Sequence, residues 1–134
     1  MSKEFSIPIR VYIEDTDAGG IVYYVNYLKF MERTRTELLR SLGLEQVSLI
    51  SEGYLFVVHS IDVRYVKPAR IDDALLSSLN VKKIGKARIV FEQTITHQES
   101  AEVLCHGTVT VACVDSLTYK PKGMGPAFMN AFAA

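Results

Sequence analysis

The spacing of apolar and polar positions changes once near the N-terminus. From Phe5 to Ile13 every second residue is apolar, and this period of two predicts a strand. The loop-like run from Asp15 to Gly20 breaks the pattern. From about Asn26 to Leu42 the apolar positions follow a helical period, and the stripe consists of Tyr27, Phe30, Met31, Thr34, Leu38 and Leu42. We assign Phe30 and Met31 to packing. Gly43 is a typical helix stop.

Long strands dominate the second half of the chain, after a weaker helical or turn segment at residues 45–51. The predicted strands are Tyr54 to Val66, Asp73 to Ile84, Ala87 to Thr96 and Val103 to Cys113. The first of them ends at Lys67-Pro68-Ala69-Arg70, because proline cannot donate a ladder hydrogen bond. A lone helix must bury its apolar stripe, so we expect an α+β fold in which an antiparallel sheet of about five strands wraps around it.

Length and composition are those of one globular domain, residues 1–134. The 15 basic and 15 acidic residues cancel and are scattered, so no nucleic-acid partner is expected. The chain has no run of about 18 apolar residues and no apolar leader, which predicts a cytoplasmic protein without a transmembrane segment. The apolar tail from Gly123 to Ala134 is expected to pack on the domain or on a partner subunit, with a membrane surface as the alternative.

Exposed sheet edges favour a homodimer or homotetramer. Cys105 and Cys113 are eight residues apart on one predicted strand, too far for the roughly 6 Å that a disulfide spans. The spacing of the three histidines, His59, His97 and His106, does not match that of a metal site.

The segment best suited to catalysis is Glu14-Asp15-Thr16-Asp17-Ala18-Gly19-Gly20-Ile21-Val22-Tyr23-Tyr24-Val25-Asn26-Tyr27. Adjacent glycines let a ligand approach the main chain, and unpaired amides at a helix start can hold a developing oxyanion. An upstream carboxylate could then activate water or attack directly. Taken alone, the pattern also suits an ordinary turn or helix cap. A metal site at Asp15 and Asp17 is less favoured, since hard cations need more oxygen ligands.

This segment, followed by Phe30-Met31-Glu32-Arg33-Thr34-Arg35, resembles the signature of the 4-hydroxybenzoyl-CoA thioesterase family, including its Tol-Pal-associated acyl-CoA thioesterase branch. The match extends through Val63-Arg64-Tyr65-Val66-Lys67-Pro68-Ala69-Arg70-Ile71-Asp72-Asp73 to Val114-Asp115. The resemblance implies a single hotdog domain that hydrolyses an acyl-CoA thioester to free acid and CoA. Coenzyme A would be part of the substrate, and no separate cofactor or metal is implied.

Carried over by that resemblance, Asp17 matches the carboxylate that acts as nucleophile or general base. Tyr24 matches the helix position whose backbone N–H polarises the thioester carbonyl. Many relatives in the Tol-Pal-associated branch have His at the position of Tyr24, but the backbone N–H is unaffected by that change. We therefore expect Tyr24→Ala to reduce activity less than Asp17→Asn.

Other residues are candidates for substrate binding, and most have a second interpretation. Tyr23 and Tyr27 would wall the acyl pocket or belong to the core, and Glu32 would face the pocket or solvent. Lys67 and Arg70 would meet CoA phosphates or be surface charges without a partner. His59 would approach the site across a dimer or, with more support, be a hydrogen-bonded core histidine. Gly20, Val22 and Val25 complete the set.

Two rival functions remain open alongside thioester hydrolysis. One is a hotdog protein that binds an acyl-CoA or acyl-carrier ligand without cleaving it. The other is a scaffold subunit in which Asp17 only caps the helix; Asp15 would likewise orient the loop or act as a cap. A lyase is a weaker third option, because hotdog dehydratases resemble this chain less around the helix and usually employ a catalytic histidine.

Overall fold

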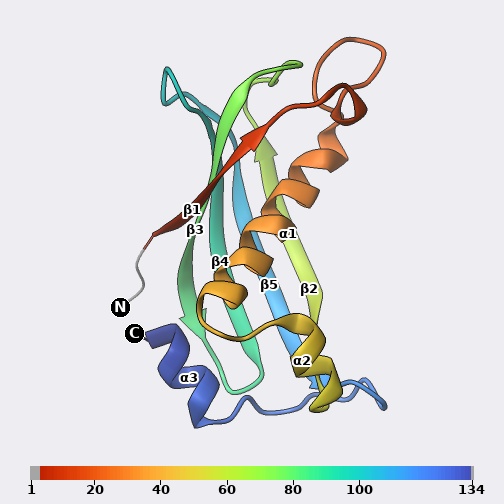
Figure 1. Cartoon of the computed structure of the whole chain (residues 1–134), viewed down its shortest axis with the longest axis vertical. Helices are drawn as coiled ribbons and strands as arrows, with labels where there is room; N and C mark the ends of the chain where they lie inside the picture. The colour runs from red at the N-terminus through yellow and green to blue at the C-terminus, as the bar shows by residue number, and fades with distance from the viewer. Residues whose placement is uncertain (1–3, 134) are drawn as a thin grey trace.

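An antiparallel sheet curves around one long helix (Figure 1). The computed structural model describes residues 4–133. Its elements are β1 (Phe5–Arg10), a 3-10 turn (Ile13–Asp15), α1 (Tyr24–Ser41), α2 (Gln46–Ser51), β2 (Tyr54–Tyr65), β3 (Ala74–Ile84), β4 (Arg88–His97), β5 (Val103–Asp115) and α3 (Pro126–Ala133). The five strands form one sheet in the order β1-β3-β4-β5-β2, and all neighbours are antiparallel. The predicted α+β architecture is confirmed.

The first strand ends earlier than its alternating pattern predicts. It stops at Arg10 rather than Ile13, because a 3-10 turn follows. The Asp15 N–H donates to the Tyr12 carbonyl at 2.9 Å, and the Tyr12 N–H donates to the Asp15 carboxylate at 2.9 Å. Ile13 is consequently 74% exposed, so its assignment to the first strand was wrong.

The central helix α1 begins at Tyr24, two residues before the predicted start at Asn26, and ends at Ser41. Its buried residues are Asn26, Tyr27, Phe30, Met31, Thr34 and Leu39. Leu38 and Leu42 of the predicted stripe are only partly buried, because the buried stripe continues from Thr34 to Leu39 at the far end of the helix. Gly43 follows with a positive φ of 77° and ends the helix as predicted.

Two polar contacts across the core fix the position of α1 along the sheet. The hydroxyls of Thr34 and Ser77 lie 2.6 Å apart. The Gln93 side chain, which is only 1% exposed, donates to the Met31 carbonyl at 3.0 Å and accepts from Arg35 at 2.9 Å. Satisfied polar groups in a core are compatible with only one alignment of helix and sheet. The first turn of α1 is thereby held at one end of the sheet.

The apolar C-terminal segment packs on its own domain. Phe128 of α3 contacts the rings of Tyr54 and Phe56, with centroids 5.0 and 5.8 Å away. Met124, Phe128 and Phe132 are buried. The predicted packing of the tail on the domain is therefore confirmed for residues 123–132; Ala134 lies outside the described residues. Across residues 4–133, the helices are too short or too polar to span a bilayer.

Strand β2 forms one edge of the sheet and pairs with β5 (Figure 1). Several of its apolar side chains are exposed, including Val57, Val58 and Ile61. The backbones of β2 and β5 approach closely at Gly107, where an added Cβ would lie 2.3 Å from the Asp62 carbonyl oxygen. The edge strand thus presents an unpaired backbone with apolar side chains, which natural sheets usually cover.

Candidate active site

Asp15 organises the β1–α1 loop (residues 11–23), which precedes the helix. Its carboxylate accepts hydrogen bonds from the Tyr12 N–H and from the Asn26 side chain, both at 2.9 Å. Its carbonyl accepts from the Tyr23 N–H at 2.8 Å. Asn26 is buried in the first turns of α1. Asp15 therefore orients the loop against the helix, and it is not the helix cap, since Tyr23 occupies that position.

Asp17 lies at a tight turn in the middle of the same loop. Its N–H donates to the Ile21 carbonyl at 2.9 Å, and its carbonyl accepts from the Gly20 N–H at 3.0 Å. One carboxylate oxygen accepts from the Gly19 N–H at 2.8 Å. Gly20 has a φ of +78°, which favours glycine. The interpretation as a turn is thus confirmed, whereas Asp17 is not a cap for α1. Its second oxygen, Oδ2, makes no hydrogen bond to any residue in the range 4–133.

The start of α1 presents backbone donors. The Asn26 N–H bonds to the Tyr23 carbonyl at 2.8 Å, but Tyr24 and Val25 precede the first intrahelical bonds. Tyr23 provides no side-chain cap. Within the described part of the chain, the Tyr24 and Val25 amides have no acceptor. These amides lie at the positive end of the helix dipole, where a partial negative charge is stabilised.

A cavity of about 250 Å³ lies at this end of the helix, with Tyr24 in its lining. Its lining residues are Ile21, Val22, Tyr24, Tyr27, Tyr65, Val66, Lys67 and Pro68. The Tyr65 ring lies 6.0 Å from the Tyr24 ring and 5.6 Å from the Tyr27 ring, measured between centroids. Burial raises the pKa of Tyr27, although the hydrogen bond from the Ala69 amide lowers it, and burial likewise raises the pKa of Tyr65. Both side chains are therefore neutral phenols near pH 7.

Four of the predicted site residues, Val22, Tyr24, Tyr27 and Lys67, line this cavity. Four further residues of the lining were not predicted from the sequence as site residues: Ile21, Tyr65, Val66 and Pro68. Tyr65 to Pro68 lie within the second quoted stretch of the family signature, which was the available signal. The Asp17 carboxylate is in the same loop as Ile21 and Val22, but Asp17 is not among the residues that line the cavity of the single chain.

Other predicted residues lie elsewhere. Val25 is half-buried outside the lining, and Tyr23 is exposed with its ring 5.0 Å from that of Tyr24. Glu32 is further along α1, at a separate cavity of about 120 Å³ that Arg35 and Gln46 also line. Burial lowers the pKa of Arg35, and Glu32 opposes that shift. Within residues 4–133, no three His, Cys, Asp or Glu side chains cluster as metal ligands would.

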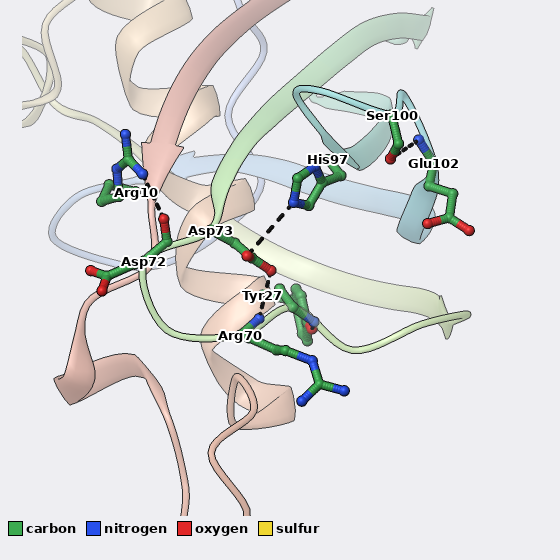
Figure 2. Close-up of polar contacts among 9 residues, drawn as sticks. Arg10, Tyr27, Arg70, Asp72, Asp73, His97, Ser100 and Glu102 are labelled. Atoms are coloured by element: carbon green, nitrogen blue, oxygen red, sulfur yellow. Dashed lines mark hydrogen bonds and ion pairs between the residues drawn. The ribbon is translucent and has the colours of Figure 1, made fainter.

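The contacts of His59, Lys67 and Arg70 bear on their predicted roles. The core-histidine interpretation of His59 was wrong, because this residue is exposed on β2 with its Nε2 atom 3.2 Å from an Arg88 nitrogen. Lys67 forms an ion pair with Glu102, so it is not a charge without a partner. Arg70 donates its backbone N–H to Asp73 at 2.9 Å, and Figure 2 shows its guanidinium directed away from that carboxylate.

Comparison with known proteins gives this geometry a family. Residues 19–104 match the model of the thioesterase superfamily. The chain is 46% identical to the acyl-CoA thioesterase YbgC of Haemophilus influenzae over 90% of this chain and 88% of that protein. It is 41% identical to the acyl-CoA thioester hydrolase YbgC of Escherichia coli, over 96% of this chain and 95% of that protein.

Solved structures agree. A probable thioesterase from Bartonella henselae superposes with a TM-score of 0.85 at 32% identity, covering 92% of this chain and 100% of that one. A 1,4-dihydroxy-2-naphthoyl-CoA thioesterase from Synechocystis superposes with a TM-score of 0.91 over 98% of this chain and 96% of that one, and at 23% identity it supports the fold alone.

The fold and the curated relatives together place the chain in the class of hotdog thioester hydrolases. The chain belongs to the thioesterase superfamily.

Proposed function

We propose that the protein hydrolyses acyl-CoA thioesters, with Asp17 as the catalytic carboxylate and the amides at the start of α1 as the oxyanion site. The observation that carries this proposal is the pair of amides at Tyr24 and Val25, which have no acceptors in residues 4–133, at the start of a helix whose Tyr24 lines a cavity. The loop that leads into this helix contains Asp17, a carboxylate with an uncommitted oxygen. The names of the relatives in Haemophilus influenzae and Escherichia coli support acyl-CoA as the substrate class.

In the proposed reaction, the thioester carbonyl oxygen accepts the Tyr24 N–H. Addition to the carbonyl carbon moves negative charge onto that oxygen, where the amide and the helix dipole stabilise it. Collapse of this adduct expels the CoA thiolate, which takes up a proton. The products are the free acid and CoA.

Asp17 acts in one of two ways. As a nucleophile it would form an acyl anhydride that water then cleaves; as a general base it would take a proton from the attacking water. A single turnover in ¹⁸O-labelled water tests for the anhydride route. Label recovered in the Asp17 peptide requires an anhydride that water opened at the Asp17 carbonyl, whereas label found only in the released acid shows that water attacked the acyl carbon, of the thioester or of the anhydride.

The role of the backbone amide can be tested by proline. Tyr24 is the first helical residue, a position where proline is well tolerated because no intrahelical bond is lost. Tyr23 has φ −62° and ψ 130°, which suits a residue before proline. Tyr24→Pro removes the donor and is expected to lower kcat about 100- to 1,000-fold. Tyr24→Ala, the matched control that keeps the N–H, should lose much less; equal losses would contradict the oxyanion role.

The substrate class is tested by thiol release. Purified protein is assayed against butyryl-CoA, decanoyl-CoA and benzoyl-CoA, with binding measured in parallel. Release of CoA with multiple turnovers supports the proposal. Binding of these thioesters without release of thiol would instead favour the acyl-CoA-binding alternative.

Arg70 and Lys67 are the proposed contacts for the CoA phosphates. Lys67 lines the cavity, and the Arg70 guanidinium forms no ion pair with any side chain in residues 4–133. Arg70→Ala is expected to raise KM with little change in kcat, because it removes binding energy common to the ground and transition states. An unchanged KM would exclude this contact.

The proposal includes a dimer that forms through β2. Val58 and Ile61 are 46% and 42% exposed on this edge strand, and pairing with a second copy would cover them. His59, also exposed on β2, would then lie at the interface. Sedimentation should show at least two copies for the wild type and for the control Leu117→Lys, and fewer for Val58→Lys. A monomeric wild type at micromolar concentration would contradict the dimer.

A cytoplasmic location is also proposed. Cys105 and Cys113 are both buried free thiols, which suits a reducing compartment. Cell fractionation should recover the protein with the cytosol, and recovery in the periplasmic or membrane fraction would contradict the proposal.

A further inference from the structure

The β2–β3 loop (residues 66–73) supports the β1–α1 loop from behind. The Ala69 carbonyl accepts from the Val22 N–H at 2.9 Å, and the Ala69 N–H donates to the Tyr27 hydroxyl at 2.9 Å. Arg70 forms an isolated β-bridge with Ile21. Ala69 is fully buried. The backbone of Ala69 and Arg70 therefore fixes Ile21 and Val22, the residues just before the free amides of α1.

Asp73 holds this support in place. Its Oδ2 atom accepts from the Arg70 N–H at 2.9 Å, and its own N–H donates to the Arg70 carbonyl at 3.1 Å. Its carbonyl accepts from the Val11 N–H at 3.0 Å, at the start of the β1–α1 loop. Figure 2 shows the Asp73 carboxylate between the Arg70 backbone and the ring of His97. Asp73 thus contacts the start of the β1–α1 loop directly, at Val11, and the end of that loop through Arg70, which bridges to Ile21.

His97, at the end of β4, faces the other oxygen of Asp73. The distance from Nε2 to Oδ1 is 3.6 Å, which is too long for a good hydrogen bond and leaves an electrostatic contact. Both side chains are 26% exposed, so solvent screens this contact only in part. The Nδ1 atom is buried without a partner among the described residues.

A second side-chain contact joins the β4–β5 turn to the β2–β3 loop and is more exposed. Lys67 and Glu102 form an ion pair whose side chains are 57% and 50% exposed, and exposed pairs contribute little. The Lys67 hydrogen bond and charge lower the pKa of Glu102. Asp73 and His97 therefore form the less exposed of these two side-chain contacts, between the end of β4 and the β2–β3 loop.

We infer that Asp73 and His97 are positioning residues for thioester hydrolysis, which set the Tyr24 and Val25 amides through Arg70, Ala69, Ile21 and Val22. The inference rests on the proposed function. Neither residue touches the substrate. Misplacement of the oxyanion donors raises the barrier of the chemical step and leaves ground-state binding nearly unchanged.

The test measures kcat and KM with the best acyl-CoA of the thiol-release screen. Asp73→Ala should lower kcat about 10- to 100-fold while KM changes by less than about threefold. Asp73→Asn keeps an acceptor for the Arg70 amide and should lose less. His97→Ala should lower kcat less than Asp73→Ala, and the double variant should match Asp73→Ala, because the two residues act in series.

Asp115 provides a matched control. Its carboxylate accepts from the Leu117 and Thr118 amides at 2.9 and 3.0 Å and lies 3.8 Å from Lys122. It therefore stabilises a turn much as Asp73 does. It pairs with Tyr54 at the start of β2, far from Tyr65 at the cavity. Asp115→Ala should lower the melting temperature but keep kcat within about twofold.

Several outcomes would overturn the inference. If Asp73→Ala lowers the melting temperature as Asp115→Ala does and leaves kcat unchanged, the role of Asp73 is purely structural. If the fold loss in kcat of the double variant equals the product of the two single losses, His97 does not act through Asp73, and its part of the inference is wrong. If Asp73→Ala does not fold, Asp73→Asn and His97→Gln replace it, and full kcat in both would overturn the inference. Wild-type activity in Asp17→Asn would instead refute the catalytic role of Asp17, and absence of thiol release by the wild type would refute the proposed function.

Discussion

The Ala69 backbone N–H donates a hydrogen bond of 2.9 Å to the hydroxyl of Tyr27, across 42 positions of sequence. Both residues are buried. The bond attaches the β2–β3 loop to the second turn of α1, while Ala69 also holds Val22 through its carbonyl. One phenol hydroxyl thereby helps to align α1 with the loop that precedes it.

Loss of this hydroxyl leaves a buried amide without an acceptor. Tyr27→Phe should lower the free energy of unfolding by about 1–3 kcal/mol and also lower kcat. Urea unfolding and thiol release measure the two effects. Tyr65→Phe is the control, since the Tyr65 hydroxyl has no hydrogen bond to the described residues; it should change stability by less than about 0.5 kcal/mol. Equal effects of the two variants would contradict this assignment.

The bond between Asn26 and Asp15 should matter in the same way. Asn26→Ala removes a buried donor to the Asp15 carboxylate and should cost about 1–3 kcal/mol of stability, with a fall in kcat because the loop loses its attachment to α1. Arg40→Ala, at the exposed far end of the helix, should change little. Full activity in Asn26→Ala would show that the loop is held without this bond.

Gly107 is predicted to be intolerant of any side chain. Its Cβ would lie 2.3 Å from the Asp62 carbonyl oxygen and 2.8 Å from the Val63 Cα, so β2 must move away from β5. Gly107→Ala should cost at least about 2 kcal/mol and weaken the proposed dimer. Gly125→Ala, where a Cβ meets nothing within 4 Å, should be nearly neutral. Similar melting temperatures for these variants would contradict the packing of β2.

Alkaline pH should destabilise the protein through Cys105. Burial raises the pKa of its thiol from 9.0 to about 12, so the folded state retains a proton that the unfolded state loses. Stability from this group is complete below pH 9 and falls as the pH rises toward 12. In urea titrations across this window, Cys105→Ala should show a shallower decline than the wild type. Parallel declines would exclude Cys105 as a source of the pH dependence.

Much of the fold was predictable because periodicity reports burial. The helical stripe through Phe30 and Met31 and the alternation of the strands fixed the architecture. The end of β1 was not predictable from alternation, because Ile13 keeps the pattern while Asp15 closes a turn with Tyr12. His59 was misjudged for a related reason, since alternation cannot distinguish an edge strand from a central one.

The site was only partly predictable. The family signature predicted Asp17 and Tyr24 as site residues, but the contacts of Asp73 with Arg70 and His97 join residues up to 24 positions apart and have no local pattern. In the sequence, Tyr65 is an ordinary aromatic residue at the end of a strand. Its contacts with the rings of Tyr24 and Tyr27 arise only in the folded chain.

The kcat of Asp17→Asn in the thiol-release assay tests the central claim most directly, with the melting temperature as a check on folding. The amide keeps the size of the side chain and an acceptor for the Gly19 N–H, but it is a poor base and nucleophile. We predict a fall in kcat of at least about 100-fold with a melting temperature close to that of the wild type. Turnover near the wild-type rate in a folded Asp17→Asn protein would contradict the mechanism.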